Sequence, residues 1–317
     1  MGNVGTLPVV SVCVLAYNHA KYIGEALDSV LNQKANFNFE ILVFDDGSSD
    51  DTPGILQSYS GRFPGKVKVF LSDKNAGNYS NAQRIKPNVE GKYIAFLDGD
   101  DKWLDENKLQ HQIDFLNNNP DFAGAFHDAV IESSYLSEAQ QYDPNRLYKG
   151  FKYYSQMYRY NDIYYPHDSL RRTIIPHSSL VFRRELFDKA MATFPKIHFS
   201  GSWLLQLMVL QNSKFKYMSQ TWSLYRDHPL GLTKVNAVSK FNFSNIKILE
   251  HLLNHPYYKS HKTLYQAIAE EYNYYAYSDE FANLSLFKKM KVLTRLGWYY
   301  VLYVLKEINF HLHSRPK

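Results

Sequence analysis

The residues best suited to chemistry form an acidic cluster within Lys92–Trp103, which reads KYIAFLDGDDKW. Asp98, Asp100 and Asp101 directly follow a short apolar run that is typical of a buried strand. Carboxylates this close together repel one another, and burying them is costly unless a cation compensates their charge. Oxygen ligands suit Mg²⁺ or Mn²⁺, so the cluster predicts a divalent cation site. The alternative is a solvated acidic turn that caps the following helix.

A regular alternation of strands and helices must position this cluster. Apolar and β-branched runs predict earlier strands at Val9–Leu15, Glu40–Phe44 and Val67–Leu71, before the acidic strand itself. Apolar spacing and proline positions predict helices at residues 23–31, 52–60, 80–88 and 105–118. Four strand–helix pairs before residue 120 indicate a doubly wound, mostly parallel α/β sheet.

Each predicted strand ends in polar residues. Because the carboxyl ends of parallel strands meet at one edge of a sheet, these side chains should converge on a single cleft. No two of the 15 glycines are two residues apart, so the glycine-rich dinucleotide motif is absent. Phosphates bound beside three carboxylates need a bridging cation, which favours a nucleotide diphosphate held through a metal. The residues at these strand ends include Tyr17, Asn18, Asp45, Asp46, Asn75, Gly77 and Asp98.

The charge distribution argues against a nucleic-acid partner. The net charge is +5, but residues 283–317 alone hold seven Lys or Arg and one acidic residue. A nucleic-acid binder would more often carry its basic residues along a groove of the folded domain. The single Cys13 excludes a disulfide framework. No secretory signal is recognisable at the start, so we expect a cytoplasmic location.

With these residues identified, the N-terminal part of the chain resembles the inverting GT-A-type glycosyltransferases of family 2. The matching segments are VSVCVLAYNHAKYIGEALDSVLNQ, FEILVFDDGSSDDT, KNAGN and GKYIAFLDGDD, in the family's order and spacing. The resemblance implies a GT-A fold and a metal-dependent transferase that uses a nucleotide-diphosphate sugar, with uridine favoured. The acceptor would be a hydroxyl of a glycan or of a lipid-linked molecule, in surface polysaccharide assembly.

The resemblance also implies roles for single residues. Asp100 would bind Mg²⁺ or Mn²⁺ and assist catalysis, with Asp98 and His228 completing the metal site; His228 belongs to a segment that resembles the family's YRxH element. His177 lies in a segment that resembles the acceptor-side wall and would contact the substrate. The donor would be held by Tyr17, Asn18 and Asp45 or Asp46 at the base, by Asn75 and Gly77 at the ribose and base, and by Asp98.

One position departs from the family pattern. Family members usually carry an Asp followed by an aromatic residue at the start of a helix, and this carboxylate is the general base. Here Ser202 precedes Trp203 at that position. Loss of a general base typically slows a reaction by about 10²–10⁴-fold. Three explanations stay open: an engineered change, another base such as His177 or Asp101, or a catalytically silent relative that binds donor or glycan without transferring sugar.

We expect a catalytic domain over residues 1–235, with the acceptor-side part at about 133–235, and a helical C-terminal region over 236–317. Tyrosines gathered between residues 133 and 170 either pack in the core or form an acceptor-facing insertion. The apolar run Leu296–Leu305 is too short to span a bilayer. Flanked by basic residues, segment 286–317 either lies in a membrane interface or packs on the body or a second subunit. The sequence does not indicate the oligomeric state.

Overall fold

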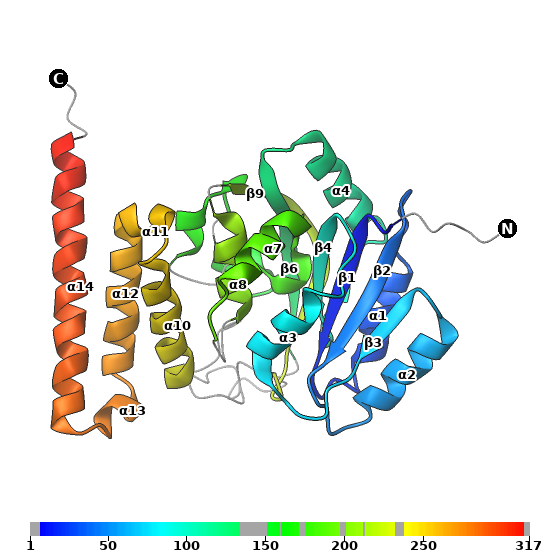
Figure 1. Cartoon of the computed structure of the whole chain (residues 1–317), viewed down its shortest axis with the longest axis horizontal. Coiled ribbons are helices and arrows are strands. Elements are labelled where there is room, and N and C mark those ends of the chain that lie inside the picture. Colours follow the sequence, from blue (N-terminus) through cyan, green and yellow to red (C-terminus); the bar gives the residue numbers. More distant parts are fainter. Residues whose placement is uncertain are drawn as a thin grey trace.

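The computed structural model of the chain is a mixed α/β fold built around one large sheet (Figure 1). It describes residues 7–133, 151–158, 160–170, 175–196, 201–211, 213–231 and 238–313. The sheet has the order β3-β2-β1-β4-β8-β6-β9-β5, and β7 also pairs with β9. The strands are β1 (Val10–Ala16), β2 (Phe39–Asp45), β3 (Val67–Phe70), β4 (Tyr93–Asp98), β5 (Lys102–Trp103), β6 (Phe122–Ser133), β7 (Ile163–Tyr164), β8 (Val181–Arg183) and β9 (Lys214–Asp227).

The N-terminal half of the sheet is parallel, because β1 pairs in parallel with β2 and β4, and β2 with β3. Its strands are largely apolar because both faces are covered. In β4, Ala95 and Leu97 pack with the helices of one face, whereas Ile94 and Phe96 pack with those of the other. The predicted doubly wound α/β sheet is confirmed. The helices of this half are α1 (Ile23–Leu31), α2 (Thr52–Arg62), α3 (Gly77–Ile85) and α4 (Lys108–Asn118).

The predicted strands agree with the structure to within one residue at each end, but two helices begin elsewhere. Helix α3 starts at Gly77 rather than residue 80, because the Asp46 carboxylate accepts the amides of Ala76 and Gly77 across a loop. Helix α4 starts later than residue 105, because the Asp105 carboxylate accepts the amide of Asn107 in a preceding turn. The first contact comes from a distant segment, so local sequence could not reveal it.

The second half of the sheet brings later parts of the chain to the same edge. Strand β8 runs antiparallel to both β4 and β6, and β9 runs parallel to β6. These two reversals make β9 parallel to β4, so both strands end at the same edge of the sheet. The residues that follow β9 therefore lie beside the acidic cluster that follows β4.

The chain after β8 is mainly helical and covers one face of the sheet before extending away from it (Figure 1). Helices α10 and α12 share one hydrophobic cluster with α7, α8 and the sheet, and α14 packs on α12 as the outermost element. The division of the chain at residue 235 stays a prediction. The described helices and turns after β6 are α6 (Tyr154–Met157), η1 (Pro166–Ser169), η2 (His177–Ser179), α7 (Arg184–Ala192), α8 (Gly201–Leu210), α10 (Val238–Leu252), α11 (Pro256–Ser260), α12 (Lys262–Ala276), α13 (Asp279–Ala282) and α14 (Leu286–His313).

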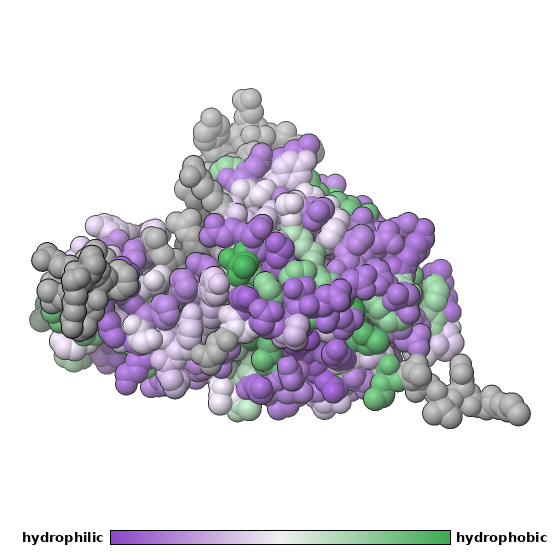
Figure 2. Space-filling model, turned by 90° about the horizontal axis from the view of Figure 1, so that it is seen from above, coloured by the Kyte–Doolittle hydropathy of each residue, from purple (hydrophilic) through white to green (hydrophobic). Residues whose placement is uncertain are grey.

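Hydrophilic residues dominate the view in Figure 2, and hydrophobic residues lie scattered among them. In the described part of the chain, no helix combines the length and the apolar character needed to cross a membrane. Of the tyrosine-rich segment, residues 134–150 lie outside the described part. Tyr154, Tyr160 and Tyr164 lie within it and pack against one another, neighbouring strands or nearby aromatic rings.

Candidate active site

The acidic cluster lies where three strands of the sheet end. Asp98 is the last residue of β4 and Asp100 follows it, while His19 follows β1 and His228 follows β9. Because β1, β4 and β9 run in the same direction, their carboxyl ends bring these four side chains together. The predicted convergence of polar groups at one edge therefore includes two histidines from distant parts of the chain.

Asp100 lies between two imidazoles. Its Oδ2 is 3.0 Å from Nε2 of His228 and 3.5 Å from Nε2 of His19. His228 is only 5% exposed, so this pair is largely withdrawn from water. Burial raises the pKa of Asp100, but His19 and His228 outweigh burial and bring the pKa below its usual value. Asp100 is therefore an ionised carboxylate held among cationic or hydrogen-bonding partners.

Asp98 is more exposed than Asp100, with a third of its side chain accessible to solvent. Its Oδ1 is 3.0 Å from Nδ1 of His177, and the imidazole ring stacks on Phe96 at 4.6 Å between centroids. The backbone amide of Asp98 donates to the hydroxyl of Ser178. The His177 segment is therefore fastened to the end of β4.

Asp101 is buried and already has partners for both carboxylate oxygens. Ser178 Oγ donates to Oδ2 at 2.5 Å, and the amide of Arg226 donates to Oδ1 at 3.0 Å. Burial and the neighbouring carboxylates of Asp100 and Asp98 raise the pKa of Asp101 well above its usual value. These contacts tie the acidic turn to η2, which includes His177, and to the end of β9, which His228 follows. They favour a positioning role for Asp101 over that of a general base.

Arg226 is a site residue that the sequence analysis missed. Its Nη1 donates to the carbonyl of Asp100 at 2.8 Å, and its Nη2 donates to Glu25 at the same distance. Its Nε donates to Glu132 at 3.2 Å, and the guanidinium lies 4.8 Å from the ring centre of Tyr22. The planar fork of arginine suits such a junction. The sequence signal that could have identified Arg226 is its place two residues before His228. His19 could have been identified in the same way, because it directly follows Asn18.

The predicted donor-binding residues after β2 mainly organise loops. Asp45 accepts hydrogen bonds from the amides of Gly47 and Ser48 in its own turn. Asp46, which is 5% exposed, accepts the two amides at the start of α3, and burial raises its pKa. Gly47 has a φ of 73°, and a Cβ there would lie 2.3 Å from the backbone of Lys74. The loops after β2 and β3 are thus locked together.

The loop after β1 completes this side of the site. Asn18 adopts a left-handed φ of 55°, and its Oδ1 accepts the amide of Ser49 at 2.8 Å. Tyr17 and Asn75 are exposed, with Tyr17 at 41%. Among the predicted donor contacts, these two side chains are the best placed to meet a ligand from solvent, while Asn18 shapes the loop.

Ser202 occupies the second position of α8 and is half-buried. The helix is fixed in place by Trp203, whose Nε1 donates to the carbonyl of Ser169 at 2.7 Å. One turn after Ser202, Gln206 Nε2 donates to the carbonyl of Ile175 at 3.3 Å. Helix α8 therefore lies beside the segment that carries His177. Residues 197–200, which precede this helix, lie outside the described part.

The donor set fits a cation that is shared with a ligand. Among the described residues, no group of three or more His, Cys, Asp or Glu could enclose a metal ion. Mg²⁺ commonly binds through one or two carboxylates together with substrate phosphates and water, rather than in an all-protein cage. Asp100 and His228 converge within 3.0 Å and offer such a partial ligand set. The residues present therefore fit Mg²⁺ or Mn²⁺ that arrives with a diphosphate.

Gly99 makes this arrangement possible by allowing the acidic turn to approach β1 and α1. A Cβ at this position would lie 2.8 Å from His19 Nδ1 and 2.9 Å from the carbonyl of Leu15. We expect Gly99→Ala to lower the free energy of unfolding in urea by about 1–3 kcal/mol, the usual cost of overpacking. Gly61→Ala in α2 is the matched control, because a Cβ there meets no atom within 4 Å. Equal stability of the two variants would contradict this explanation.

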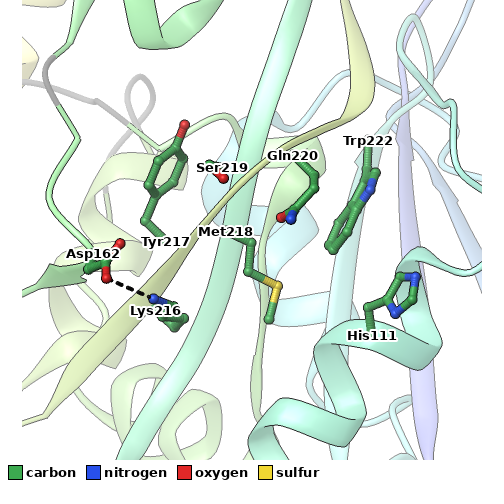
Figure 3. Close-up of a pocket in the computed structure, with 8 residues that line it drawn as sticks. All are labelled: His111, Asp162, Lys216, Tyr217, Met218, Ser219, Gln220 and Trp222. Atoms are coloured by element: carbon green, nitrogen blue, oxygen red, sulfur yellow. Dashed lines mark ion pairs between the residues drawn. The ribbon is translucent and has the colours of Figure 1, made fainter.

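A surface pocket lies away from the acidic cluster (Figure 3). It has a volume of about 530 Å³ and is formed mainly by β9 with His111 of α4, beside the ion pair of Lys216 with Asp162. The pocket shares no residue with the acidic cluster. The location of the candidate active site is therefore based on the convergence of charged side chains after β1, β4 and β9, and not on this pocket.

Comparisons with known proteins show the family to which the chain belongs. The family described as glycosyl transferase family 2 matches residues 11–190. An uncharacterised protein of Mycobacterium tuberculosis (strain H37Rv) is 26% identical over 223 residues, which are 70% of this chain and 60% of that protein. The minor teichoic acid biosynthesis protein GgaA of Bacillus subtilis is 32% identical over 109 residues, 33% of this chain and 24% of GgaA.

The fold is also found in a solved structure. The crystal structure of S. aureus TarS 1-349 in complex with UDP-GlcNAc matches with a TM-score of 0.63 and 18% identity, covering 92% of this chain and 80% of that one. The chain belongs to glycosyl transferase family 2, and its fold is that of the GT-A glycosyltransferases. It spans only 60% of the length of the mycobacterial relative.

Proposed function

We propose that the protein is an inverting glycosyltransferase that moves a sugar from a nucleotide-diphosphate donor, most favourably a UDP-sugar, to a hydroxyl of a glycan or lipid-linked acceptor. The observation that carries the proposal is the convergence of Asp100 with His228, beside Asp98, at the carboxyl edge of the sheet. UDP-GlcNAc in the TarS structure supports the choice of donor, and GgaA supports a role in cell-surface polymer synthesis. The proposed location is the cytoplasm, at the cytoplasmic face of the membrane.

In this reaction the acceptor oxygen attacks the anomeric carbon while the bond from that carbon to the diphosphate oxygen breaks. The acceptor proton passes to a base, and the electron pair leaves with the diphosphate. Asp100 and His228 would hold Mg²⁺ or Mn²⁺, which neutralises the charge that develops on the leaving group. Tyr17 and Asn75 would contact the nucleoside, and Asp98 would face the ribose or a water bound to the metal.

The proton acceptor is the incomplete part of the proposed site. Ser202 holds the position where family members usually carry an Asp, and a hydroxyl does not accept a proton at neutral pH as a carboxylate does. His177 is oriented by Asp98 at 3.0 Å, in the way a carboxylate orients an imidazole base, and it is the alternative acceptor. A serine at this position is compatible with a slow transferase and with a silent relative that binds donor without transferring sugar. A measurement of turnover distinguishes the two.

Donor binding is tested by titrating the protein with UDP and with GDP in a calorimeter, with Mn²⁺ and with EDTA. We expect UDP to bind more tightly than GDP, and Mn²⁺ to strengthen UDP binding by at least about tenfold, because a cation held by Asp100 and His228 would offset the charge of the diphosphate. Tyr17→Ala should weaken binding of UDP with and without the metal, whereas the exposed Tyr277→Ala is a matched control outside the site. Absence of UDP binding in the presence of Mn²⁺ would remove the main support for the proposal.

A further inference from the structure

Helix α14 is attached to the protein by one face. Val292, Leu296 and Tyr299 pack against the cluster that contains α12, and the Tyr299 ring stacks on Tyr272 at 5.8 Å. Arg295 Nη1 also donates to the hydroxyl of Tyr272 at 2.9 Å. These contacts fix the rotation of the helix about its axis. Figure 1 shows α14 at the end of the molecule that lies farthest from β3.

The opposite side of α14 is apolar, and within the described part of the chain it stays exposed to solvent. Its side chains are between 49% and 79% exposed, although large hydrophobic groups are usually buried. At 3.6 residues per turn they occupy roughly 140° of the helix circumference. We call this surface the outward face; it is represented by Phe287, Met290, Leu293, Trp298, Val301 and Leu305.

The charge along α14 is mainly positive. Residues 286–313 contain five Lys or Arg and one acidic residue, Glu307. Lys288 and Lys291 are exposed and lie along one border of the outward face by helical spacing. Arg295 and Lys306 belong to the same border, but Arg295 contacts Tyr272 of α12 and Lys306 contacts the carbonyl of Lys259 in α11. An apolar stripe with cations along its border is complementary to a partner whose apolar interior lies beneath a layer of anionic groups.

We infer that the outward face of α14 docks the protein on an anionic lipid surface, with the helix axis parallel to the membrane plane. Amphipathic helices with basic borders and aromatic residues bind in this way, and Trp298 provides an indole of the kind that favours the interface. A second copy of the helix fits less well. The face is broader than the narrow seam of a coiled coil, and a copy would bring a second set of cations to it.

The test uses the full chain and flotation with two kinds of vesicle, phosphatidylcholine alone and phosphatidylcholine mixed with phosphatidylglycerol. We expect binding to the anionic vesicles that weakens as salt is raised. Replacing Lys288 and Lys291 with Gln should weaken it by about fivefold for each lysine. Leu293→Ser combined with Trp298→Ser should weaken binding to anionic vesicles by at least about tenfold through lost apolar burial.

Tyr277→Ser is the matched control, since this aromatic side chain is 86% exposed and lies outside α14. Thermal unfolding should be unchanged in all variants because the replaced side chains lie outside the core. Absence of binding to anionic vesicles, or binding that the outward-face variants leave intact, would overturn the inference. A second outcome would also overturn it: light scattering shows a dimer that Leu293→Ser combined with Trp298→Ser converts to a monomer, and the unchanged protein does not bind vesicles. None of these measurements depends on sugar transfer, so failure here leaves the proposed function untouched.

Discussion

Ser202→Asp is expected to raise the rate of sugar transfer by about 10²–10⁴-fold, the usual contribution of a positioned general base. The substitution puts a carboxylate in the first turn of α8, where the positive end of the helix dipole favours negative charge. Because Ser202 is half-buried and its helix is fixed by Trp203 and Gln206, the new side chain should not disturb the fold. The measurement is release of UDP from a UDP-sugar with Mn²⁺ present.

Ser202→Asn is the matched control for this experiment. Asn has nearly the size and shape of Asp but cannot take up a proton, so its rate should stay at that of the unchanged protein. UDP affinity should be equal in all three proteins, because donor binding does not involve this residue in the proposed site. Equal turnover by Ser202→Asp and the unchanged protein would show that the proton acceptor lies elsewhere, and His177→Gln would then be the next variant.

The parts of the fold that sequence could predict are those set by local pattern. The acidic turn after β4 was recognisable because a continuous apolar run ends abruptly in Asp98, and the parallel sheet followed from repetition of that pattern. Strands β8 and β9 were not assigned to the sheet, since their pairing with β4 and β6 depends on contacts between distant segments. Family resemblance nevertheless pointed to His228, and the sheet places it at Asp100.

The contacts that sequence did not reveal are those that link loops. The capping of α3 by Asp46 comes from a residue about 30 positions earlier, and Arg226 contacts Glu25, which lies 201 positions earlier in the chain. In the same way, sequence predicted donor contacts for Asp45, but its carboxylate is engaged by the amides of its own turn. Residue type indicated that these side chains belong to the site, and only the tertiary structure distinguishes ligand-facing groups from positioning groups.

The C-terminal helix illustrates a different limit. Sequence left open whether segment 286–317 packs on the body, on a subunit or on a membrane, because a helical period shows only how apolar residues are spaced. The structure shows that α14 has two apolar sides, one packed through Val292 and Leu296 and one exposed through Met290 and Trp298. Packing of α14 on α12 therefore explains one apolar side of the helix, but it does not explain the exposed outward face.

Asp100→Asn is expected to abolish the strengthening of UDP binding by Mn²⁺. The substitution keeps the size of the side chain and removes the charge that lies 3.0 Å from His228 Nε2 and 3.5 Å from His19 Nε2. A neutral amide is a poor ligand for a hard divalent cation, so the variant should bind UDP equally with Mn²⁺ and with EDTA. Calorimetry of the unchanged protein and the variant under both conditions provides the measurement.

Turnover gives a second and independent measurement when Asp100→Asn is combined with Ser202→Asp, which supplies the base. A metal ion held by Asp100 would contribute several kcal/mol of charge stabilisation to the leaving group, so the rate should fall by at least about 100-fold relative to Ser202→Asp alone. Asp114→Asn, whose carboxylate accepts a hydrogen bond from Gln110 on the surface of α4, is the matched control and should change neither quantity. If Asp100→Asn keeps its dependence on Mn²⁺, then Asp100 is not a metal ligand. The pairing of Asp100 with His228 would then serve to hold the end of β9 against the acidic turn, as the contacts of Asp101 and Arg226 already do.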